Sequence, residues 1–220
     1  MPYPLLESTR PLSRRQVLAL AAAIPVGVVT PPSARADAPT AASSHDPTAA
    51  QRMSEPGPEE NKLRGWTGQW DVIASLWPAP GAQPIVSRGI IAERAMIGPI
   101  LQEIMHPTPG SPTADFRRLD YLNFDRVEGR WKYVSMDTRF PVSIMPAWSF
   151  GPQHDGRITV EFNPQAFVGF GKEVEGRFMA SDMVISQPGP DRTLKEQHVT
   201  MADGTGRSWQ FVRYDYKRRP

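Results

Sequence analysis

The sequence predicts an all-β domain, a closed antiparallel up-and-down barrel of about nine or ten strands. From Leu63 to Lys217, aromatic and β-branched residues alternate with polar ones, which is the period of a half-buried strand. Turn-forming residues recur at intervals of about 8–12 residues, the spacing of a barrel or sandwich. No long segment has helical periodicity. A two-sheet β-sandwich is the alternative fold.

The first strand is predicted after a short helical turn that begins at Pro58-Glu59-Glu60, where Pro and acidic residues suit a helix start. Its residues alternate, and the sequence ends the strand at the turn 77–81, Trp-Pro-Ala-Pro-Gly. One face carries Trp66, Gly68, Trp70, Val72, Ala74 and Leu76, and the other carries Thr67, Gln69, Asp71, Ile73 and Ser75.

The remaining strands are predicted from the same alternation. They are Ile85–Arg94, Ile100–His106, Phe116–Phe124, Arg130–Thr138, a strand with Ile158, Val160 and Phe162, a strand with Val168, Phe170, Val174 and Phe178, Leu194–Met201, and Ser208–Tyr216. The turns between them include Gly98-Pro99, 125–129, Asp155-Gly156 and Asp203-Gly204. Sequential hairpins favour a meander, and a meander that closes on itself leaves no exposed edge.

Residues 1–36 have the features of an export signal. Arg14 and Arg15 form a twin-arginine pattern, an uncharged run follows over 17–29, and Ala34 and Ala36 suit signal peptidase. The run is shorter than the roughly 20 residues that span a bilayer. We therefore expect recognition by the twin-arginine export machinery, cleavage after Ala36, no stable membrane span after processing, and a periplasmic or secreted protein.

The composition divides the rest of the chain and excludes some partners. Residues 37–60 are rich in Ala, Pro, Ser and Thr, which predicts a flexible tether, and 61–217 form the barrel domain. Residues 1–36 hold four of the 25 basic and one of the 23 acidic residues, so the mature chain has 21 against 22, a net charge of −1. No basic patch indicates nucleic acid, and the lack of Cys excludes disulfides and thiolate metal sites.

The segment Gly68-Gln69-Trp70 resembles the Gly-x-Trp signature of calycins, the lipocalin-like barrels. The resemblance implies that Trp70 closes the bottom of the barrel and that an Arg of the last strand packs over its ring. Arg213, within Phe211-Val212-Arg213-Tyr214, is the candidate for this Arg. Such a stack is a cation–π contact worth about 0.5–2 kcal/mol.

A longer stretch, about residues 58–216, is similar to the bacterial domain-of-unknown-function family 1579. The similar segments are Asn61-Lys62-Leu63, Gly68–Val72, 77–81, Ser87-Arg88-Gly89, Glu93-Arg94, Ile97-Gly98, Asn123-Phe124-Asp125, 130–134 and Met136-Asp137. The resemblance implies an exported calycin-type barrel whose activity is not established.

Two carboxylates are candidates for contact with a ligand. Glu103 shares a face with Leu101 and Met105, and Asp137 shares a face with Tyr133 and Trp131. If those faces line the barrel, Glu103, Tyr133 and Asp137 point inward and can orient a ligand. The opposite faces are equally apolar, so the alternation leaves the inward face open: Ile100 and Ile104 lie on one, Val134 and Met136 on the other.

The three histidines of the domain, His106, His154 and His198, lie on or next to different strands and do not have metal-ligand spacing. No cofactor and no metal site are predicted. The sequence favours a barrel that binds a small apolar or amphipathic molecule inside, with Glu103, Tyr133, Asp137 or His198 fixing its orientation. One alternative is a haem-binding or enzymatic barrel that uses His198. Another is an interaction module with a side-chain-filled barrel, and a homodimer is left open. No nucleophile motif is present, so an enzyme is the less favoured hypothesis.

Overall fold

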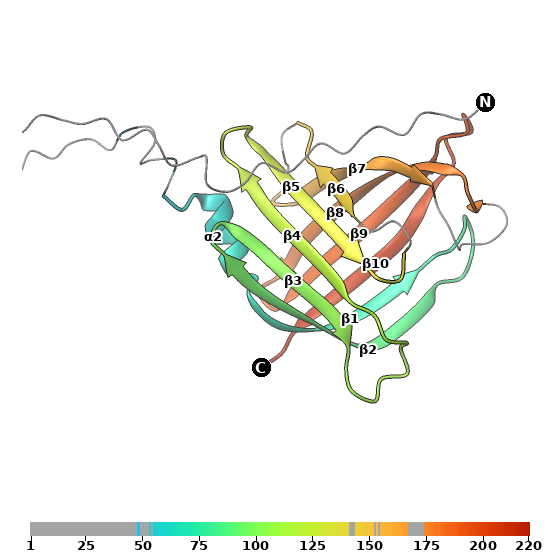
Figure 1. Cartoon of the computed structure of the whole chain (residues 1–220), viewed down its shortest axis with the longest axis horizontal. Helices are drawn as coiled ribbons and strands as arrows, with labels where there is room; N and C mark the ends of the chain where they lie inside the picture. Colours follow the sequence, from blue (N-terminus) through green and yellow to red (C-terminus); the bar gives the residue numbers. More distant parts are fainter. Residues whose placement is uncertain are drawn as a thin grey trace, which may run out of the picture. The chain divides into compact units, whose positions relative to one another are not determined.

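Ten strands form one closed antiparallel barrel (Figure 1). The computed structural model describes residues 48, 53, 55–140, 144–151, 153, 155–166 and 174–220. Each strand pairs with its neighbour in the sequence, and β1 also pairs with β10. The predicted up-and-down barrel is thus confirmed in preference to the sandwich. The predicted signal residues Arg14, Arg15, Ala34 and Ala36, and also His154, lie outside the described residues.

The described elements follow one another with short connections. They are α2 (Pro58–Arg64), β1 (Gly68–Leu76), β2 (Ile85–Ile97), β3 (Ile100–Pro107), β4 (Arg118–Asp125), β5 (Arg130–Asp137), β6 (Met145–Trp148), β7 (Ile158–Ala166), β8 (Phe178–Gly189), β9 (Arg192–Met201) and β10 (Ser208–Arg218). The predicted hairpin turns at Gly98 and at 125–129 are present, and the glycines at both have positive φ angles.

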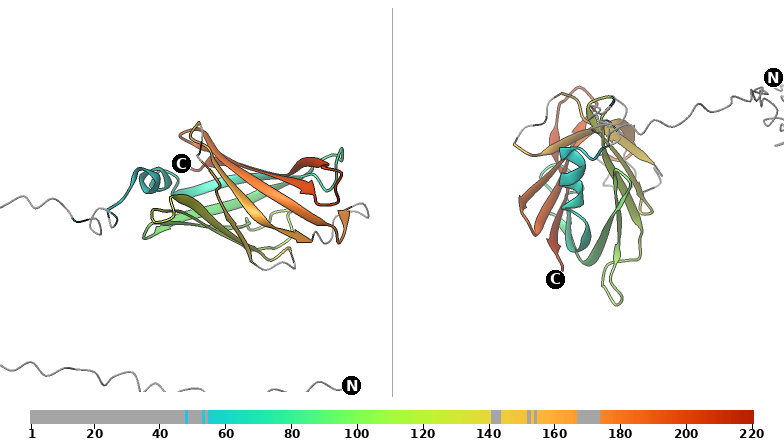
Figure 2. Two further views of the ribbon diagram at one scale, coloured as in Figure 1. Left: turned by 90° about the horizontal axis from the view of Figure 1, so that it is seen from above. Right: turned by 90° about the vertical axis from the view of Figure 1, so that its left-hand side faces the viewer.

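The helix α2 closes one end of the barrel, as Figure 2 shows in both views. It begins with Pro58, carries acidic residues in its first turn and basic residues in its last, and matches the predicted helical turn. Leu63 on the helix and Trp66 just after it are fully buried against the barrel. Among the described residues, no helix has the length and apolar character needed to cross a bilayer.

The first strand has the predicted inward face. Trp70, Val72 and Ala74 are buried, whereas Asp71 and Ile73 between them are exposed. The β1–β10 pairing runs from Trp70 opposite Arg218 to Leu76 opposite Val212, and it is this pairing that closes the barrel.

Two segments differ from the prediction. β6 was not predicted, because its four residues include Pro146 and are too few to show an alternation. Phe178 was expected to share an apolar face with Val168 and Phe170, but residues 167–173 lie outside the described part of the chain. Phe178 is instead the first residue of β8, with 58% of its surface exposed, because the inward positions of this strand begin at Met179.

The buried apolar side chains form two clusters. The helix-end cluster lies next to α2 and includes Leu63, Trp66, Leu101, Leu122, Trp131 and Met183. The other cluster begins at Trp70, beside Trp66, and extends to the end opposite α2. We name its part at that end the far-end cluster, which includes Met105, Phe116, Met179, Met201, Phe211 and Tyr214. On β3, Glu103 stands between Leu101 of the first cluster and Met105 of the second, and all three are buried. The barrel interior therefore changes from apolar to charged and back along its length.

Candidate functional site

Seven charged side chains of alternating sign run through the barrel interior, and we name them the ionic chain. In order of contact they are Arg94, Glu103, Lys195, Asp120, Arg118, Asp137 and Arg139. They come from β2, β3, β9, β4 and β5, and the last follows β5. The first six are buried, whereas the side chain of Arg139 is 32% exposed.

The chain begins with Arg94 and Glu103, which face each other across β2 and β3. Arg94 Nε lies 2.6 Å from Glu103 Oε2, and Arg94 Nη1 donates a hydrogen bond to Thr193. The guanidinium also lies over the Tyr216 ring, 4.2 Å from its centroid, and the Tyr216 hydroxyl donates to Glu103 Oε1 at 3.0 Å. Both buried charges therefore have several partners, as burial requires.

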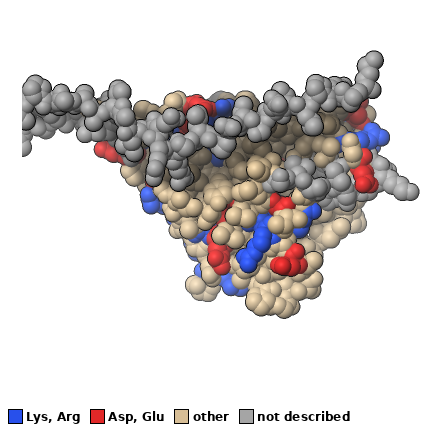
Figure 3. Space-filling view, in the orientation of Figure 1, with Lys and Arg blue, Asp and Glu red and all other residues tan. Residues whose placement is uncertain are grey.

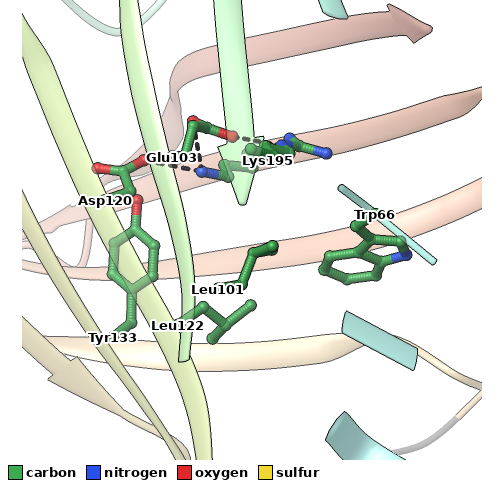
Figure 4. Close-up of a pocket in the computed structure, with 8 residues that line it drawn as sticks. Trp66, Leu101, Glu103, Asp120, Leu122, Tyr133 and Lys195 are labelled. Atoms are coloured by element: carbon green, nitrogen blue, oxygen red, sulfur yellow. Dashed lines mark hydrogen bonds and ion pairs between the residues drawn. The ribbon is translucent and has the colours of Figure 1, made fainter. Parts of the chain in front are cut away.

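Lys195 joins two carboxylates that would otherwise repel each other. Glu103 and Asp120 are direct cross-strand neighbours on β3 and β4, and like charges at such positions are destabilising. From β9, Lys195 Nζ reaches Glu103 Oε1 at 2.8 Å and Asp120 Oδ2 at 2.7 Å, as Figure 4 shows. Its ammonium group therefore makes the close approach of the two acids possible.

Arg118 continues the chain toward the end of the barrel opposite α2. Its Nε donates to Asp120 Oδ1 at 3.0 Å, and its two Nη atoms donate to the hydroxyls of Tyr214 and Tyr133 at 2.7 and 3.1 Å. Arg118 Nη1 also lies 3.7 Å from Asp137 Oδ2.

Arg139 ends the chain by forming a two-pronged pair with Asp137. Its Nε donates to Oδ1 at 2.9 Å and its Nη2 to Oδ2 at 2.5 Å, the geometry that guanidinium and carboxylate favour. The guanidinium stacks on the Phe116 ring with its carbon 3.9 Å from the centroid. Phe116 and Tyr214 are buried in the far-end cluster, so the guanidinium lies over that cluster.

The ionic chain shifts the pKa values of its members. Burial alone would raise the pKa of Glu103, but the charges of Lys195 and Arg94 outweigh it and lower this pKa. Burial opposes ionisation of Asp120 as well, and Arg118 and Lys195 hold its pKa well below the usual range. Burial and nearby carboxylates raise the pKa values of Tyr133 and Tyr216 well above that of a free phenol. Glu103 and Asp120 are thus charged, and the Tyr133 and Tyr216 phenols are neutral, at pH 7.

These shifts predict how folding stability depends on pH. Glu103 and Asp120 have lower pKa values when folded than the value of about 4 in an unfolded chain, so the unfolded state binds more protons. Their contribution is present above about pH 5 and is lost as the pH falls through 4 toward the folded pKa values. Tyr133 and Tyr216 have raised pKa values, so their contribution is lost above about pH 10. Urea unfolding across this range should show a plateau between the two limits. If the free energy of unfolding stays constant when the pH is lowered below 4, the assigned pairing is contradicted.

The space between the ionic chain and α2 is nearly filled. A cavity of about 10 Å³ lies there, and its walls include Trp66, Leu101, Leu122, Glu103 and Lys195 (Figure 4). That volume holds about one water molecule. This cavity is therefore too small for a ligand larger than water.

Three predicted ligand-binding residues, Glu103, Tyr133 and Asp137, are brought together in the interior. The inward face that the alternation left open is now resolved, since the faces that carry them are buried. Glu103 and Asp137 are members of the ionic chain, and Tyr133 accepts a hydrogen bond from Arg118. On the same face of β5, the buried hydroxyl of Ser135 has no hydrogen-bond partner among the residues that the structure describes.

His198 does not line the interior, and its predicted role there is corrected. Its side chain is 41% exposed on the outer face of β9, with Nδ1 3.8 Å from Asp182 Oδ2. Val199 and Met201 are buried, and the two-residue period of the strand places their neighbour outside. A haem or catalytic site inside the barrel therefore cannot use His198. Within the described residues, no three His, Cys, Asp or Glu side chains are grouped to hold a metal ion.

The prediction that Arg213 packs over Trp70 is wrong, but another arginine of the last strand does lie over the Trp70 ring. Arg213 lies on the outer face of β10, 3.7 Å from Glu196. The guanidinium over Trp70 belongs to Arg218, 4.2 Å from the ring centroid, and it donates to the carbonyls of Thr67 and Gly65. Gly68 has a φ of +114°, and a Cβ there would lie 3.1 Å from Arg218 Nη1. The positive φ therefore favours glycine at position 68, and a Cβ there would also press against the Arg218 guanidinium.

Five members of the ionic chain were not predicted: Arg94, Asp120, Arg118, Lys195 and Arg139. For Arg94 and Lys195, the apolar residues on the same strands indicate the inward position. Buried Ile90 and Ala92 give the inward face of β2, and Val199 and Met201 give that of β9. Every second residue of a strand lies on the same face, so the inward face of β2 also carries Arg94 and that of β9 also carries Lys195.

Comparison with models of known protein families gives no match to this chain. A search of curated proteins gives no match either.

Proposed function

We propose that the protein is exported and binds a small amphipathic molecule inside its barrel. The polar end of this molecule lies at the exposed end of the ionic chain, and its apolar part lies against the far-end cluster. The observation that carries the proposal is the ionic chain itself, which is buried at Arg94 and reaches solvent at Arg139.

Filling a barrel with buried charges costs free energy of solvation. Each ion loses several kcal/mol of solvation, and well-packed apolar residues in place of a buried ion pair are often neutral or stabilising by about 1–4 kcal/mol. Stability alone therefore does not explain seven charges. The hydroxyl of Ser135, which has no partner in the described part of the chain, supports the same conclusion, because a buried polar atom without a partner calls for a bound water or ligand atom.

The packing favours one end of the barrel for the ligand. Trp66 and Leu63 close the end at α2, and the cavity there holds about one water. The far-end cluster contains Met105, Met179 and Met201, whose flexible side chains can rearrange around an apolar guest. The exposed side chain of Arg139 joins this cluster to solvent.

The proposal that the protein is exported rests on residues 1–36. Arg14 and Arg15, the uncharged run after them, and Ala34 and Ala36 support recognition by the twin-arginine export machinery and a periplasmic or secreted location. The proposed division is a signal at 1–36, a tether at 37–60 and the barrel domain at 61–217. Membership of the barrel domain in family 1579 is part of this proposal and rests on the resembling segments alone.

Native mass spectrometry tests the proposal without a chosen ligand. The full chain is expressed in a host with twin-arginine export, and the exported protein is purified without detergent. We expect a polypeptide that begins at Asp37 and carries a small-molecule mass, which solvent extraction removes and which has an ionisable group and an apolar part. A bare polypeptide, even under the gentlest conditions, would contradict the carrier function.

A second candidate function is self-association through the outer face of the barrel. On the outer face of β3, β4 and β5 a patch of partly exposed apolar side chains lies in the middle of the strands, with Ile104, Leu119 and Met136 in one cross-strand row and Tyr121 opposite Val134. Figure 3 shows little charge over the middle of β4 and β5. Because a second copy would offer the same apolar patch, a homodimer would cover both. Light scattering after gel filtration should give a dimer mass that Leu119→Glu reduces to a monomer; a monomer in the unchanged chain would reject this candidate.

A further inference from the structure

We infer that the polar end of the ligand is a singly charged oxyanion, a carboxylate in the simplest case, held by Arg139 and Tyr214. This inference rests on the proposed function and specifies its ligand class. It is drawn from the charge balance of the interior and from the hydrogen-bond donors that the ionic chain leaves over.

The ionic chain has one cation in excess. It contains four cations, Arg94, Lys195, Arg118 and Arg139, against three anions, Glu103, Asp120 and Asp137. Tyr133 and Tyr216 add no negative charge, because their pKa values are raised well above the usual value. One bound anion would balance the chain.

The excess charge lies where a ligand can reach it. Arg94, Lys195 and Arg118 are buried, whereas 32% of the Arg139 side chain is exposed. Arg139 uses Nε and Nη2 for Asp137, and among the described residues its Nη1 has no acceptor. Two N–H donors of the outermost cation are therefore left for a bound group.

The hydroxyl of Tyr214 supplies a further donor. Its oxygen accepts hydrogen bonds from Arg118 Nη1 at 2.7 Å and from Arg139 Nη2 at 3.4 Å. Both arginine nitrogens can only donate, so the hydroxyl hydrogen points to another acceptor. No described residue provides one. Arg139 Nη1 and the Tyr214 hydroxyl thus present adjacent donors, which match the two oxygens of a carboxylate.

The surroundings select against other polar groups. A dianion would bring a second negative charge that no cation of the ionic chain balances, close to Asp137, which is itself hydrogen-bonded to Arg139. A neutral alcohol could accept these hydrogen bonds but would leave the excess charge unbalanced. The guanidinium of Arg139 stacks on Phe116, and Phe116 is in one apolar cluster with Met105 and Met201. The oxyanion is therefore expected to carry an apolar tail.

Isothermal titration calorimetry with matched probes tests the inference on the full chain. The probes are octanoate, 1-octanol and acetate, at pH 7. We expect octanoate to bind at least tenfold more tightly than 1-octanol, and acetate to bind far more weakly than either. Octanoate and 1-octanol have the same chain length, so their difference isolates the charged end.

Three variants locate the anion. Arg139→Gln and Tyr214→Phe should each bring the affinity for octanoate to within about threefold of that for 1-octanol. Tyr214→Phe keeps the ring in the far-end cluster, so this variant still tests the site if Arg139→Gln does not fold. Arg117→Gln, an exposed neighbour that is not in the ionic chain, should keep the tenfold preference.

The outcomes separate this inference from the proposed function. Equal binding of octanoate and 1-octanol, or a preference that survives both Arg139→Gln and Tyr214→Phe, overturns the oxyanion site and leaves the amphipathic carrier standing. Acetate binding as tightly as octanoate overturns the apolar tail and indicates a site for a free small anion. If neither octanoate nor 1-octanol binds, the carrier function is contradicted and the inference falls with it.

Discussion

Replacing Lys195 by Met is expected to lower the free energy of unfolding by about 3–5 kcal/mol, the cost of removing one partner from a buried ion pair. Lys195 Nζ is the shared partner of Glu103 and Asp120, at 2.8 and 2.7 Å. Without it, two buried carboxyl groups face each other across β3 and β4, and one must take up a proton or remain a charge without its cation. Urea unfolding at pH 7, monitored by far-ultraviolet circular dichroism, measures the change.

Two further variants show whether the loss comes from the carboxylates. Lys217→Met alters an exposed lysine on the neighbouring strand β10 and should change stability by no more than about 0.5 kcal/mol. Adding Glu103→Gln to Lys195→Met removes one of the facing charges and should recover part of the lost stability. A Lys195→Met variant as stable as the unchanged chain would show that its ammonium does not lie between these acids.

Replacing Trp70 by Ala is expected to cost about 3–5 kcal/mol, the usual range for deleting a large aromatic side chain from a core. Trp70 is fully buried, its indole N–H donates to the Trp66 carbonyl at 3.1 Å, and Arg94 and Arg218 lie against its ring. The substitution removes apolar contacts and leaves two guanidinium groups without their aromatic surface. Thermal and urea unfolding both report the loss.

The matched control for this change is Trp148→Ala. Trp148 is only partly buried, in the short strand β6, and stacks with Phe150 near the surface, so its loss should cost clearly less. Equal losses for the two tryptophans would contradict the role of Trp70 in closing the barrel.

The barrel could be predicted because its strands are long and its turns are marked. In β1, buried Trp70, Val72 and Ala74 alternate with outward residues, and the turns at Gly98 and 125–129 set the hairpins. β6 could not be found in this way, because four residues with a proline have no clear period. Arg218 was missed because the last strand extends beyond the predicted end at Tyr216.

The site could be predicted only in part, and the reason lies in β3 and β5. Each of these strands has apolar residues on both of its faces, so Glu103 and Asp137 could not be assigned to the interior from the pattern. A charged residue at an inward position also contradicts the usual rule that charges face water. Lys195 shows this most clearly, because only its partners on β3 and β4 explain why an ammonium group is buried.

The location of the ligand inside the barrel can be measured directly by NMR of methionine methyl groups labelled with carbon-13. Met105 and Met201 lie in the far-end cluster, Met183 lies in the helix-end cluster, and Met136 is on the outer face. With octanoate added to the full chain, we expect chemical-shift changes at Met105 and Met201 and none at Met183 or Met136. Shifts confined to Met136, with Met105 and Met201 unchanged, would place the ligand on the outside and contradict a carrier barrel.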